Sequence, residues 1–313
     1  MHHFLILLSL LLYLHSITAL AFNPKSSFFK SASGKATFKY GLGGAARSTQ
    51  PKILPSLYSD LVHKSVESDD ADVAPFYFYY NPHRYPDFMS GIKEICEDGR
   101  EDVFIASGGT DRSYSMMERR LQDALAYCGG EYLDMFVLEY VCHGEENDIK
   151  QALKQAIEWK RRGLVRYIAA STHSHEIGAS LCSETGIDAL MLRYNMSHRK
   201  AAENISFPAC KDKNIPVIAF TTTRWNALQS GHEHSQNDTP PTSGECLSYA
   251  LMTSPPVDMV LHSARDEEEL KESMDALRCM SKDVIFKWGK YGDLNWNEMD
   301  GFDEYPHEQT LTL

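Results

Sequence analysis

The residues of this 313-residue chain whose types and spacing are best suited to chemistry are Ser171, Thr172 and His173. They directly follow residues 165–170, a mainly apolar run that is typical of a buried parallel strand. Gly163, just before that run, is suited to end a helix, because glycine enters the left-handed region at little cost. Hydroxyl and imidazole groups at the carboxyl end of such a strand lie where the loops of a parallel α/β barrel bind their ligands.

Other polar side chains follow other strand-like runs, and together with His173 they predict a mixed acidic and basic rim. These side chains are Glu139, Arg193, His198, Arg199 and Arg224. We interpret His173, Arg193 and Arg224 as a substrate pocket, in which Arg193 is better suited to bind an anion than to transfer a proton. A metal-dependent barrel hydrolase that uses Glu139, His173 and His198 is an alternative. No H-x-H pair lies within a strand, and we predict no metal site.

Strand-like and helix-like runs alternate along the chain. The eight strand-like runs cover residues 37–41, 76–80, 103–107, 134–140, 165–171, 189–194, 216–221 and 258–263. Amphipathic helices are predicted over residues 53–68, 116–127, 146–162 and 267–278. Eight alternating units over about 275 residues match an α/β fold of the TIM (β/α)8 barrel type. An open doubly wound sheet is the alternative, but no G-x-G-x-x-G motif follows an early strand.

The composition excludes some classes of partner. The net charge of −12 argues against nucleic acid as a partner, because duplex binders need basic patches. The seven cysteines are odd in number and dispersed, and they form no C-x-x-C pair. We therefore expect neither a zinc site nor a disulfide framework, and we favour a reducing compartment.

The first 40 residues have the composition of targeting segments. Residues 4–12 are apolar but too short to span a bilayer easily, and small residues at 18–21 fit a cleavage site. Residues 22–39 are rich in Ser, Lys and Phe and contain no acidic residue, which is typical of transit peptides. This pattern predicts the plastid stroma, reached through a secretory-type signal. Simple secretion is the alternative, and it would make glycosylation sites of three Asn-x-Ser/Thr motifs, at Asn195, Asn204 and Asn237.

Four segments are therefore predicted. Residues 1–21 form a signal peptide, residues 22–40 a transit-like segment, residues 41–287 the barrel, and residues 288–313 an aromatic and acidic C-terminal extension. The polar residues 231–243 read as a long loop after the seventh strand. No transmembrane helix is expected in the mature chain.

Several segments in combination resemble the aldo-keto reductase superfamily. They include "GLVRYIAAS", "LMLRYNMSHRKAAENISFPAC", "IPVIAFTTTRW" and "VDMVLHSARDEEELKESMDAL". The resemblance implies a TIM barrel that binds NADP(H) across its C-terminal face. It also implies cofactor contacts: Ser171 and Thr172 with the nicotinamide carboxamide, Phe220 with the nicotinamide ring, and Ser263 and Arg265 with the 2′-phosphate.

The chain departs from the catalytic pattern of that superfamily. Gly108 stands at the position of the catalytic Lys, Glu139 at that of the His, and the catalytic Asp has no clear counterpart. The catalytic Tyr survives only as Tyr79 or Tyr80. Met191 replaces a carboxamide-binding Gln, Glu269 replaces a phosphate-side Gln or Arg, and Ser273 replaces an adenine-side Asn.

Two functions follow from these observations. The first is an NADPH-dependent oxidoreductase that reduces a small carbonyl or enone substrate, with Tyr79, Tyr80 and Glu139 as catalytic candidates. The second is a non-catalytic NADP-binding pseudoenzyme that acts as a sensor or scaffold.

Overall fold

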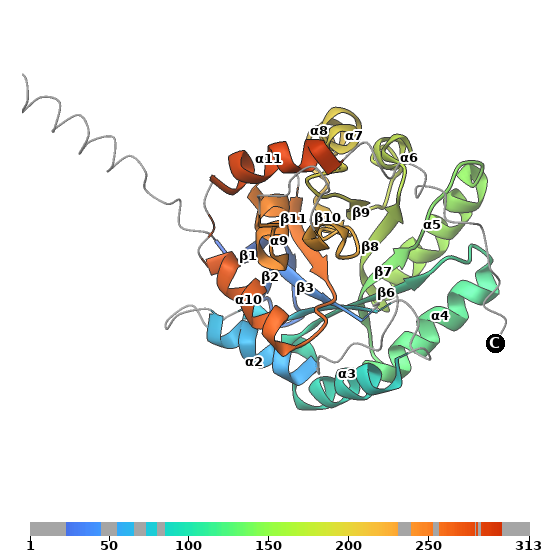
Figure 1. Ribbon diagram of the computed structural model, residues 1–313. Coiled ribbons are helices and arrows are strands. Elements are labelled where there is room, and N and C mark those ends of the chain that lie inside the picture. The colour runs from blue at the N-terminus through green and yellow to red at the C-terminus, as the bar shows by residue number, and fades with distance from the viewer. Residues whose placement is uncertain are drawn as a thin grey trace, which may run out of the picture.

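The chain folds into a closed parallel β-barrel surrounded by helices (Figure 1). The computed structural model describes residues 23–44, 55–65, 73–79, 85–230, 239–252, 257–278, 280 and 283–295. The barrel strands run in the closed order β10-β11-β3-β5-β6-β7-β8-β9, and every neighbouring pair is parallel. They are β3 (Tyr40–Gly43), β5 (Phe76–Tyr79), β6 (Phe104–Gly109), β7 (Leu133–Leu138), β8 (Val165–Thr172), β9 (Ala189–Arg193), β10 (Val217–Phe220) and β11 (Val257–His262). The predicted (β/α)8 barrel is confirmed, and the open doubly wound sheet is excluded.

Helices cover the outside of the barrel. They are α2 (Pro55–Ser65), α3 (Pro86–Gly99), α4 (Tyr114–Tyr127), α5 (Glu146–Arg161), α6 (His175–Leu181), α7 (Arg199–Ala201), α8 (Phe207–Lys213), α9 (Ser243–Met252), α10 (Glu267–Arg278) and α11 (Asp283–Asn295). Short helical turns lie at Arg100–Asp102 (η2), Ala202–Ser206 (η3) and Ala227–Ser230 (η4). The predicted amphipathic helices correspond to α2, α4, α5 and α10. In α5, for example, Ile149, Leu153 and Ala156 are buried on one face.

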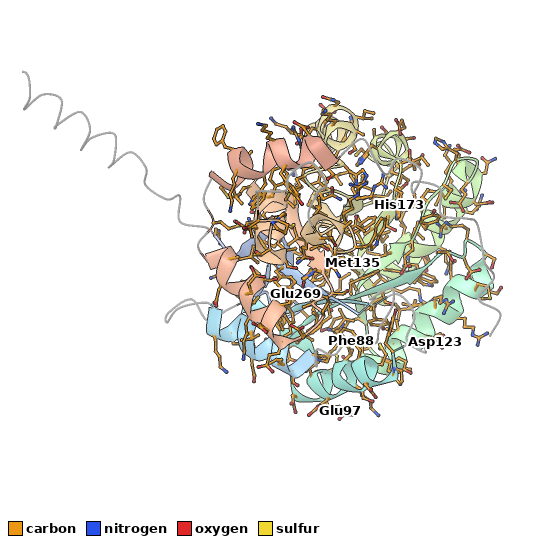
Figure 2. All side chains as sticks on the ribbon, in the orientation of Figure 1. Phe88, Glu97, Asp123, Met135, His173 and Glu269 are labelled. Atoms are coloured by element: carbon orange, nitrogen blue, oxygen red, sulfur yellow. The ribbon has the colours of Figure 1, made fainter. Side chains whose placement is uncertain are left out.

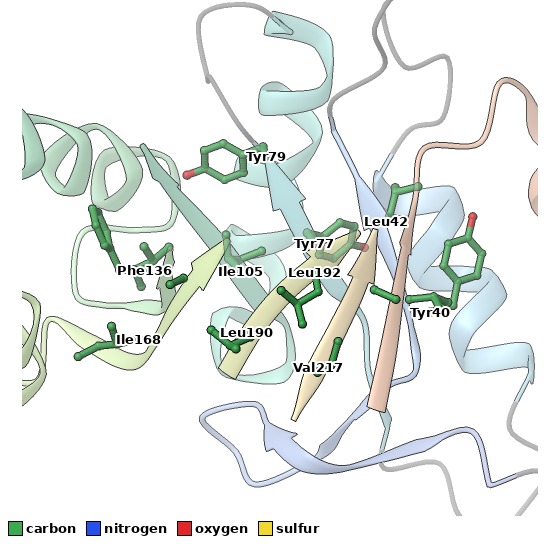
Figure 3. Close-up of a cluster of buried hydrophobic side chains, with 14 of the residues drawn as sticks. Tyr40, Leu42, Tyr77, Tyr79, Ile105, Phe136, Ile168, Leu190, Leu192 and Val217 are labelled. Carbon is green, nitrogen blue, oxygen red and sulfur yellow. The ribbon is translucent and has the colours of Figure 1, made fainter. Parts of the chain in front are cut away.

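Strand side chains divide between two apolar layers with the period of two that a β-strand imposes. On β6, Phe104 and Ala106 point into the barrel, whereas Ile105 points to the helices. Figure 2 places Met135 of β7 near the centre of the barrel, and Figure 3 shows part of the outer layer. Because the same alternation continues to the ends of the strands, it decides which candidate side chains reach the barrel mouth.

A small three-stranded sheet closes the N-terminal end of the barrel. It consists of β1 (Lys25–Lys30), β2 (Ala36–Phe38) and β4 (Val73–Ala74). Phe29 of β1 is 1% exposed and belongs to the interior cluster, where its ring contacts Phe76, Phe104 and Tyr167. The first strand-like run at 37–41 therefore holds the end of β2 and the start of β3, and the barrel strand itself begins at Tyr40.

Two buried carboxylates attach β1 to the barrel. Asp258 accepts hydrogen bonds from the Ser26 hydroxyl and from the backbone N–H of Ser27. Asp134 accepts a 2.5 Å bond from Arg166, whose guanidinium also donates to the carbonyl oxygens of Lys30 and Ser31. The boundary expected at residue 40 therefore lies inside the folded unit, and residues 25–40 contribute to the barrel.

At the opposite end of the chain, α11 packs on the barrel. Trp288 and Tyr291 are 3% and 5% exposed and join a cluster with Leu228 and Tyr249. The Tyr291 hydroxyl donates to the Leu228 carbonyl oxygen at 2.8 Å. The expected boundary at residue 287 thus falls within α11, and residues 296–313 lie outside the described part. Within the described residues, no helix has the length and apolar character needed to span a bilayer.

Candidate functional site

Five candidate residues from four neighbouring strands gather at the C-terminal mouth of the barrel. Glu139 follows β7, Ser171 and His173 lie at the end of β8, Arg193 ends β9, and Phe220 ends β10. Ser171 and Arg193 continue the inward-facing parity of their strands, since Ala169 and Met191 belong to the interior cluster. Carboxyl ends of parallel barrel strands are where this fold places its active sites.

Glu139 is the most perturbed acid of this mouth. It is 4% exposed, and its Oε1 has no hydrogen-bond partner among the described residues. Burial raises the pKa of the Glu139 carboxyl well above its usual value, and the nearby charges of Arg112 and Arg120 only partly oppose that rise. A carboxyl group with a raised pKa stays protonated at pH values at which an exposed glutamate is ionised, and in that form it can donate a hydrogen bond.

Arg112 is a part of this site that the sequence analysis missed. Its guanidinium donates to the backbone carbonyl oxygens of Glu139 at 2.5 Å and of Gly109 at 3.1 Å, and lies 3.6 Å from Glu145. Arg112 therefore links the ends of β6 and β7 and keeps a permanent positive charge near Glu139. The available sequence signal was its position five residues after the predicted strand-like run 103–107, which the structure extends to Gly109 as β6.

Two aromatic rings enclose His173 at the end of β8. The His173 ring lies 5.1 Å from the Tyr140 ring and 5.3 Å from the Phe220 ring, measured between centroids. Tyr140 has a positive φ of 54° and donates its backbone N–H to the Ser171 Oγ at 2.9 Å. The Ser171 hydroxyl accepts this bond and keeps its own proton for a ligand. Figure 2 labels His173 on the side of the barrel on which α6 lies.

Buried positive charge marks the β9 and β10 sector. Arg193 and Arg224 are 6% and 4% exposed, and the charge of Arg193 lowers the pKa of Tyr140 against a larger effect of burial. Arg224 follows β10 in a segment where Thr221, Trp225 and Asn226 also have positive φ. Non-glycine residues in this region of φ are uncommon and concentrate at functional sites.

The loop after β9 changes one expectation about glycosylation. Asn195 is fully buried: its amide donates to the Thr221 carbonyl oxygen at 3.0 Å and accepts from the backbone N–H groups of Ser197 and His198. Asn195 is therefore a structural residue of the mouth and is not an accessible glycan acceptor. Asn204 is exposed, and Asn237 lies outside the described residues.

Thr172 does not fit the expected contact with the cofactor. Its side chain has the outward parity of Ile168 and Ala170, and it is 1% exposed. The hydroxyl donates to the Val141 carbonyl oxygen at 2.8 Å and accepts from the Ser174 backbone N–H at 3.1 Å. Thr172 therefore stabilises the turn after β8, and of the expected Ser–Thr pair only Ser171 faces the mouth.

Tyr79 does not fit its expected role either. It lies in the outer layer between strands and helices, as Figure 3 shows, and burial raises its pKa well above the usual value. This orientation moves its hydroxyl away from the mouth, so Tyr79 is a core residue. Tyr80, the other candidate, lies outside the described residues.

Gly108 shows that the missing lysine cannot simply be restored. A Cβ atom at this position would lie 1.9 Å from the Val137 backbone oxygen. Strands β6 and β7 therefore approach too closely at this point to admit any side chain. The position that the superfamily resemblance assigns to a lysine is closed by backbone.

The expected phosphate end of the cofactor site lies beyond β11. The Ser263 hydroxyl donates to the Gly43 carbonyl oxygen at 2.7 Å, so its proton is already used. The Arg265 side chain is 58% exposed, and its Nε donates to Glu269 at 3.1 Å. Its terminal guanidinium nitrogens make no hydrogen bond within the described part of the chain, so they are accessible to solvent.

Glu269 holds a negative charge beside Arg265. It is 6% exposed, accepts from the Arg265 backbone N–H at 2.6 Å and from the Ser243 hydroxyl, and lies 3.9 Å from His262. Burial raises the pKa of this carboxyl, but the hydrogen bonds from Ser243 and Arg265 hold it below its usual value. Glu269 is therefore ionised, and Figure 2 shows it on α10.

The metal-hydrolase alternative has no support in this geometry. Among the described residues, no group of three or more His, Cys, Asp or Glu side chains could hold a metal ion. His198 instead places its Nδ1 3.3 Å from the Asn195 amide nitrogen. Glu139, His173 and His198 lie at the same end of the barrel without forming such a group.

Fold and site together define a parallel (β/α)8 barrel with an acid, a hydroxyl group, an imidazole and buried arginines at its C-terminal mouth. The aldo/keto reductase family model matches residues 71–245, more than half of the chain, and the protein belongs to this family. No relative among curated proteins matches the sequence significantly.

Solved structures of aldo-keto reductases resemble the fold. One from Klebsiella pneumoniae, in complex with NADP and acetate, has 14% sequence identity and a TM-score of 0.66 over 87% of this chain and 96% of that one. A second, the holo form from Bacillus halodurans, has 15% identity and a TM-score of 0.63 over 85% of this chain and 96% of that one. At this level of identity the likeness concerns the fold.

Proposed function

We propose that the protein is an NADPH-dependent oxidoreductase that reduces the carbonyl group or the conjugated C=C bond of a small molecule. The observation that carries the proposal is Glu139. It is buried at the barrel mouth, its pKa is raised by that burial, and its Oε1 has no partner among the described residues. A neutral acid in this position can donate a hydrogen bond to a substrate oxygen on which negative charge develops.

The residues present fit a nicotinamide dinucleotide at both ends of the site. At one end, the Phe220 ring offers a stacking face and the Ser171 hydroxyl keeps a proton for the carboxamide. At the other end, the exposed guanidinium of Arg265 is suited to a 2′-phosphate. When bound, NADPH would supply the hydride.

The chain's own groups would then position and polarise the substrate. Glu139 would donate a hydrogen bond from its protonated carboxyl group to the substrate oxygen, and Arg112 would hold the Glu139 backbone in place through its bond to the Glu139 carbonyl oxygen. The buried guanidinium of Arg193 would attract an anionic or electron-rich part of the substrate. The aromatic rings of Tyr140 and Phe220 would exclude water from one side.

The test is NADPH oxidation against a panel of aldehydes, quinones and enones, with the parent, Glu139→Ala and Tyr80→Phe measured together. Tyr80 has the sequence parity of Phe76 and Phe78, so Tyr79→Phe is a matched control from the outer layer. We expect a large loss in Glu139→Ala and none in Tyr79→Phe. Equal turnover in all variants would mean that the site lies elsewhere.

A non-catalytic NADP-binding protein is the second candidate, and two observations favour it. Gly108 cannot carry a side chain because of the Val137 backbone, and the Tyr79 hydroxyl is turned away from the mouth. A sensor or scaffold would bind NADPH without consuming it. Calorimetry that detects NADPH binding, combined with no turnover on the whole panel, would support this candidate over the enzyme.

For the cellular location, we propose the plastid stroma, reached through a secretory-type signal. The apolar run at 4–12 and the acid-free segment that follows it support this proposal. The free thiols of the described cysteines are compatible with a reducing compartment. A fluorescent fusion that carries residues 1–40 and stays in the cytosol would contradict it.

A further inference from the structure

Two cysteines 28 positions apart in the sequence lie side by side in the helical layer. Cys182 directly follows α6, and Cys210 lies on α8. Their sulfur atoms are 3.4 Å apart, and the two residues are 5% and 0% exposed. Their spacing has no motif signature, so only the fold brings them together.

We propose that Cys182 and Cys210 form a redox-responsive dithiol that small peroxides oxidise to an intramolecular disulfide. A disulfide bond is about 2.05 Å long, so the sulfur atoms need to approach each other by only about 1.4 Å. α6 is a single helix of seven residues, whereas α8 continues directly from η3, so α6 is the element that can adjust by this amount more easily.

The environment distinguishes the attacking sulfur from the resolving one. The hydrogen bond between the two thiols lowers the pKa of Cys182 and raises the pKa of Cys210. Cys182 also has the charge of Lys213 in its surroundings, and it is the more exposed of the two. Its lowered pKa and its greater exposure favour Cys182 as the sulfur that meets the oxidant as a thiolate, with Cys210 as the resolving thiol.

The chemistry balances in two steps. The Cys182 thiolate attacks one peroxide oxygen; an S–O bond forms, the O–O bond breaks, and the departing hydroxide takes up a proton to become water. The Cys210 sulfur then attacks the Cys182 sulfenic acid; an S–S bond forms, the S–O bond breaks, and the departing hydroxide takes the Cys210 proton. One peroxide is reduced to two waters, and two thiols are oxidised to one disulfide.

A disulfide here would fix α6 at both ends. At its first residue, His175 places its Nδ1 3.0 Å from the Ser206 hydroxyl of η3. At its C-terminal end, the new bond would join Cys182 to α8. Because α6 directly follows the turn that carries His173, oxidation would restrain the outer support of β8 at the barrel mouth.

The experiment uses the full chain under native conditions. Reduced protein is treated with a small excess of hydrogen peroxide, remaining thiols are alkylated, and peptides are mapped by mass spectrometry. We expect a loss of about 2 Da from the pair, as two hydrogen atoms leave, and a linked peptide that contains residues 182 and 210 and disappears with a reductant. The melting temperature of the oxidised protein should rise.

Variants separate this pair from the other thiols. Cys182→Ser should abolish the linked peptide and the rise in melting temperature. Cys246→Ser, a buried cysteine on α9, is the matched control and should leave both unchanged. Cys96 and Cys128 also share a thiol–thiol hydrogen bond, and the peptide map reports any link between them separately.

The parent protein alone can overturn the proposal, whatever the stability of the variants. Cys182 and Cys210 that remain fully alkylatable after peroxide treatment, while circular dichroism shows a folded chain, would contradict it. A link that forms only between Cys96 and Cys128 would contradict it too.

Discussion

Glu139 is governed by two opposing effects, and their balance decides what the residue can do. Burial penalises the ionised carboxylate, whereas Arg112 and Arg120 stabilise it. Burial is the larger effect, so the carboxyl group stays protonated over a pH range in which an exposed glutamate is ionised. The charges of the two arginines limit how far the pKa of Glu139 rises.

Replacing Glu139 separates hydrogen bonding from ionisation. Glu139→Gln keeps a hydrogen-bond donor and should retain most activity, whereas Glu139→Ala should lose about 10²-fold or more. In the parent, activity should fall as the pH rises through the raised pKa of Glu139, because the donor is lost on ionisation. Glu139→Gln should lack this fall. Steady-state rates between pH 5 and 10 test the prediction, and Glu268→Gln, an exposed acid on α10, is the control.

The stability of the same variants gives a readout that is independent of turnover. Because folding raises the pKa of Glu139, the folded chain holds a proton that the unfolded chain releases above the ordinary value of 4.5. The contribution of Glu139 to the free energy of unfolding should therefore decrease as the pH rises above that value, and the difference between the parent and Glu139→Gln isolates it from the opposite contribution of His262. Identical pH profiles of stability in the parent and in Glu139→Gln would contradict the assignment of a neutral Glu139.

Arg265 and Glu269 should have opposite effects on cofactor selectivity. Arg265→Ala should weaken NADPH binding by roughly 1.5–3 kcal/mol, the range for a hydrogen bond to a charged group, and leave NADH binding nearly unchanged. Glu269→Gln removes the negative charge beside Arg265 and should strengthen NADPH binding only. Calorimetry with both dinucleotides tests this, and equal changes for the two would place the 2′-phosphate elsewhere.

At the residue scale, the period of two in the strands explains which expectations from the sequence succeeded. Ser171 and Arg193 continue the inward parity of their strands, whereas Tyr79 and Thr172 have the outward parity. This rule was available from the sequence. The near contact between Gly108 and the Val137 oxygen was not, because it depends on the local approach of two backbones.

At the scale of elements, the junction of β11 and α10 depends on a buried polar network. The His262 Nδ1 lies 3.2 Å from the Tyr40 hydroxyl, and Glu269 joins His262, Ser243 and Arg265. Burial lowers the pKa of His262 to about 4, although Glu269 opposes the shift. The folded chain therefore holds a neutral histidine that connects a strand of the barrel to the helix outside it.

This network predicts acid sensitivity. Between pH 6.5 and about 4 the unfolded chain protonates His262, whereas the folded chain does not, so the contribution of His262 to the free energy of unfolding falls as the pH falls. The loss should reach about 3 kcal/mol near pH 4 and then level off. Urea unfolding of the parent and of His262→Gln tests this. The loss should disappear in His262→Gln and persist in His63→Gln, an exposed control on α2.

Sequence patterns predicted a strand or helix well where the element itself has an apolar run or an amphipathic periodicity. The apolar runs and the amphipathic periodicity placed the strands near β5 to β11 and the helices α2, α4, α5 and α10. They misread β1, because its Ser and Lys residues match a targeting peptide in composition. What makes residues 25–30 a strand is long-range: Phe29 fills the barrel floor, and Asp258 binds Ser26 across 232 positions.

At the scale of the whole molecule, the two ends of the barrel differ in how they are closed and in which charged residues they bury. The N-terminal end is closed by β1, β2 and β4 and carries ion pairs of the buried Asp134 with Arg100 and Arg166. The C-terminal end collects the buried ionisable residues Glu139, Arg193 and Arg224, and removing ionisable groups from water costs stability. This division is expected of a TIM barrel, in which residues at the N-terminal face stabilise the fold and residues at the C-terminal face bind ligands.

The N-terminal closure predicts how far the chain can be shortened. Removal of residues 1–22 should leave the melting temperature unchanged, whereas removal of residues 1–40 takes β1, β2 and Tyr40 and should abolish the folded barrel. A point variant tests the same closure on a smaller scale. Phe29→Ala should lower the free energy of unfolding by about 3–5 kcal/mol, as for other buried phenylalanines. Phe28→Ala, at a neighbouring ring that is 38% exposed, is the matched control and should cost far less.

The same closure limits where targeting cleavage can end. If a signal peptide is removed after about residue 21, any second cut in the transit-like segment must fall before Lys25, because Ser26 and Phe29 are needed in the folded protein. We therefore expect the mature chain to begin between residues 22 and 25, rather than near residue 40 as composition alone suggests. Mass spectrometry of the protein purified from its native cells reads this terminus directly. A folded mature chain that begins at or after Tyr40 would show that the barrel closes without β1, and that neither Phe29 nor the bond between Ser26 and Asp258 is needed to close it.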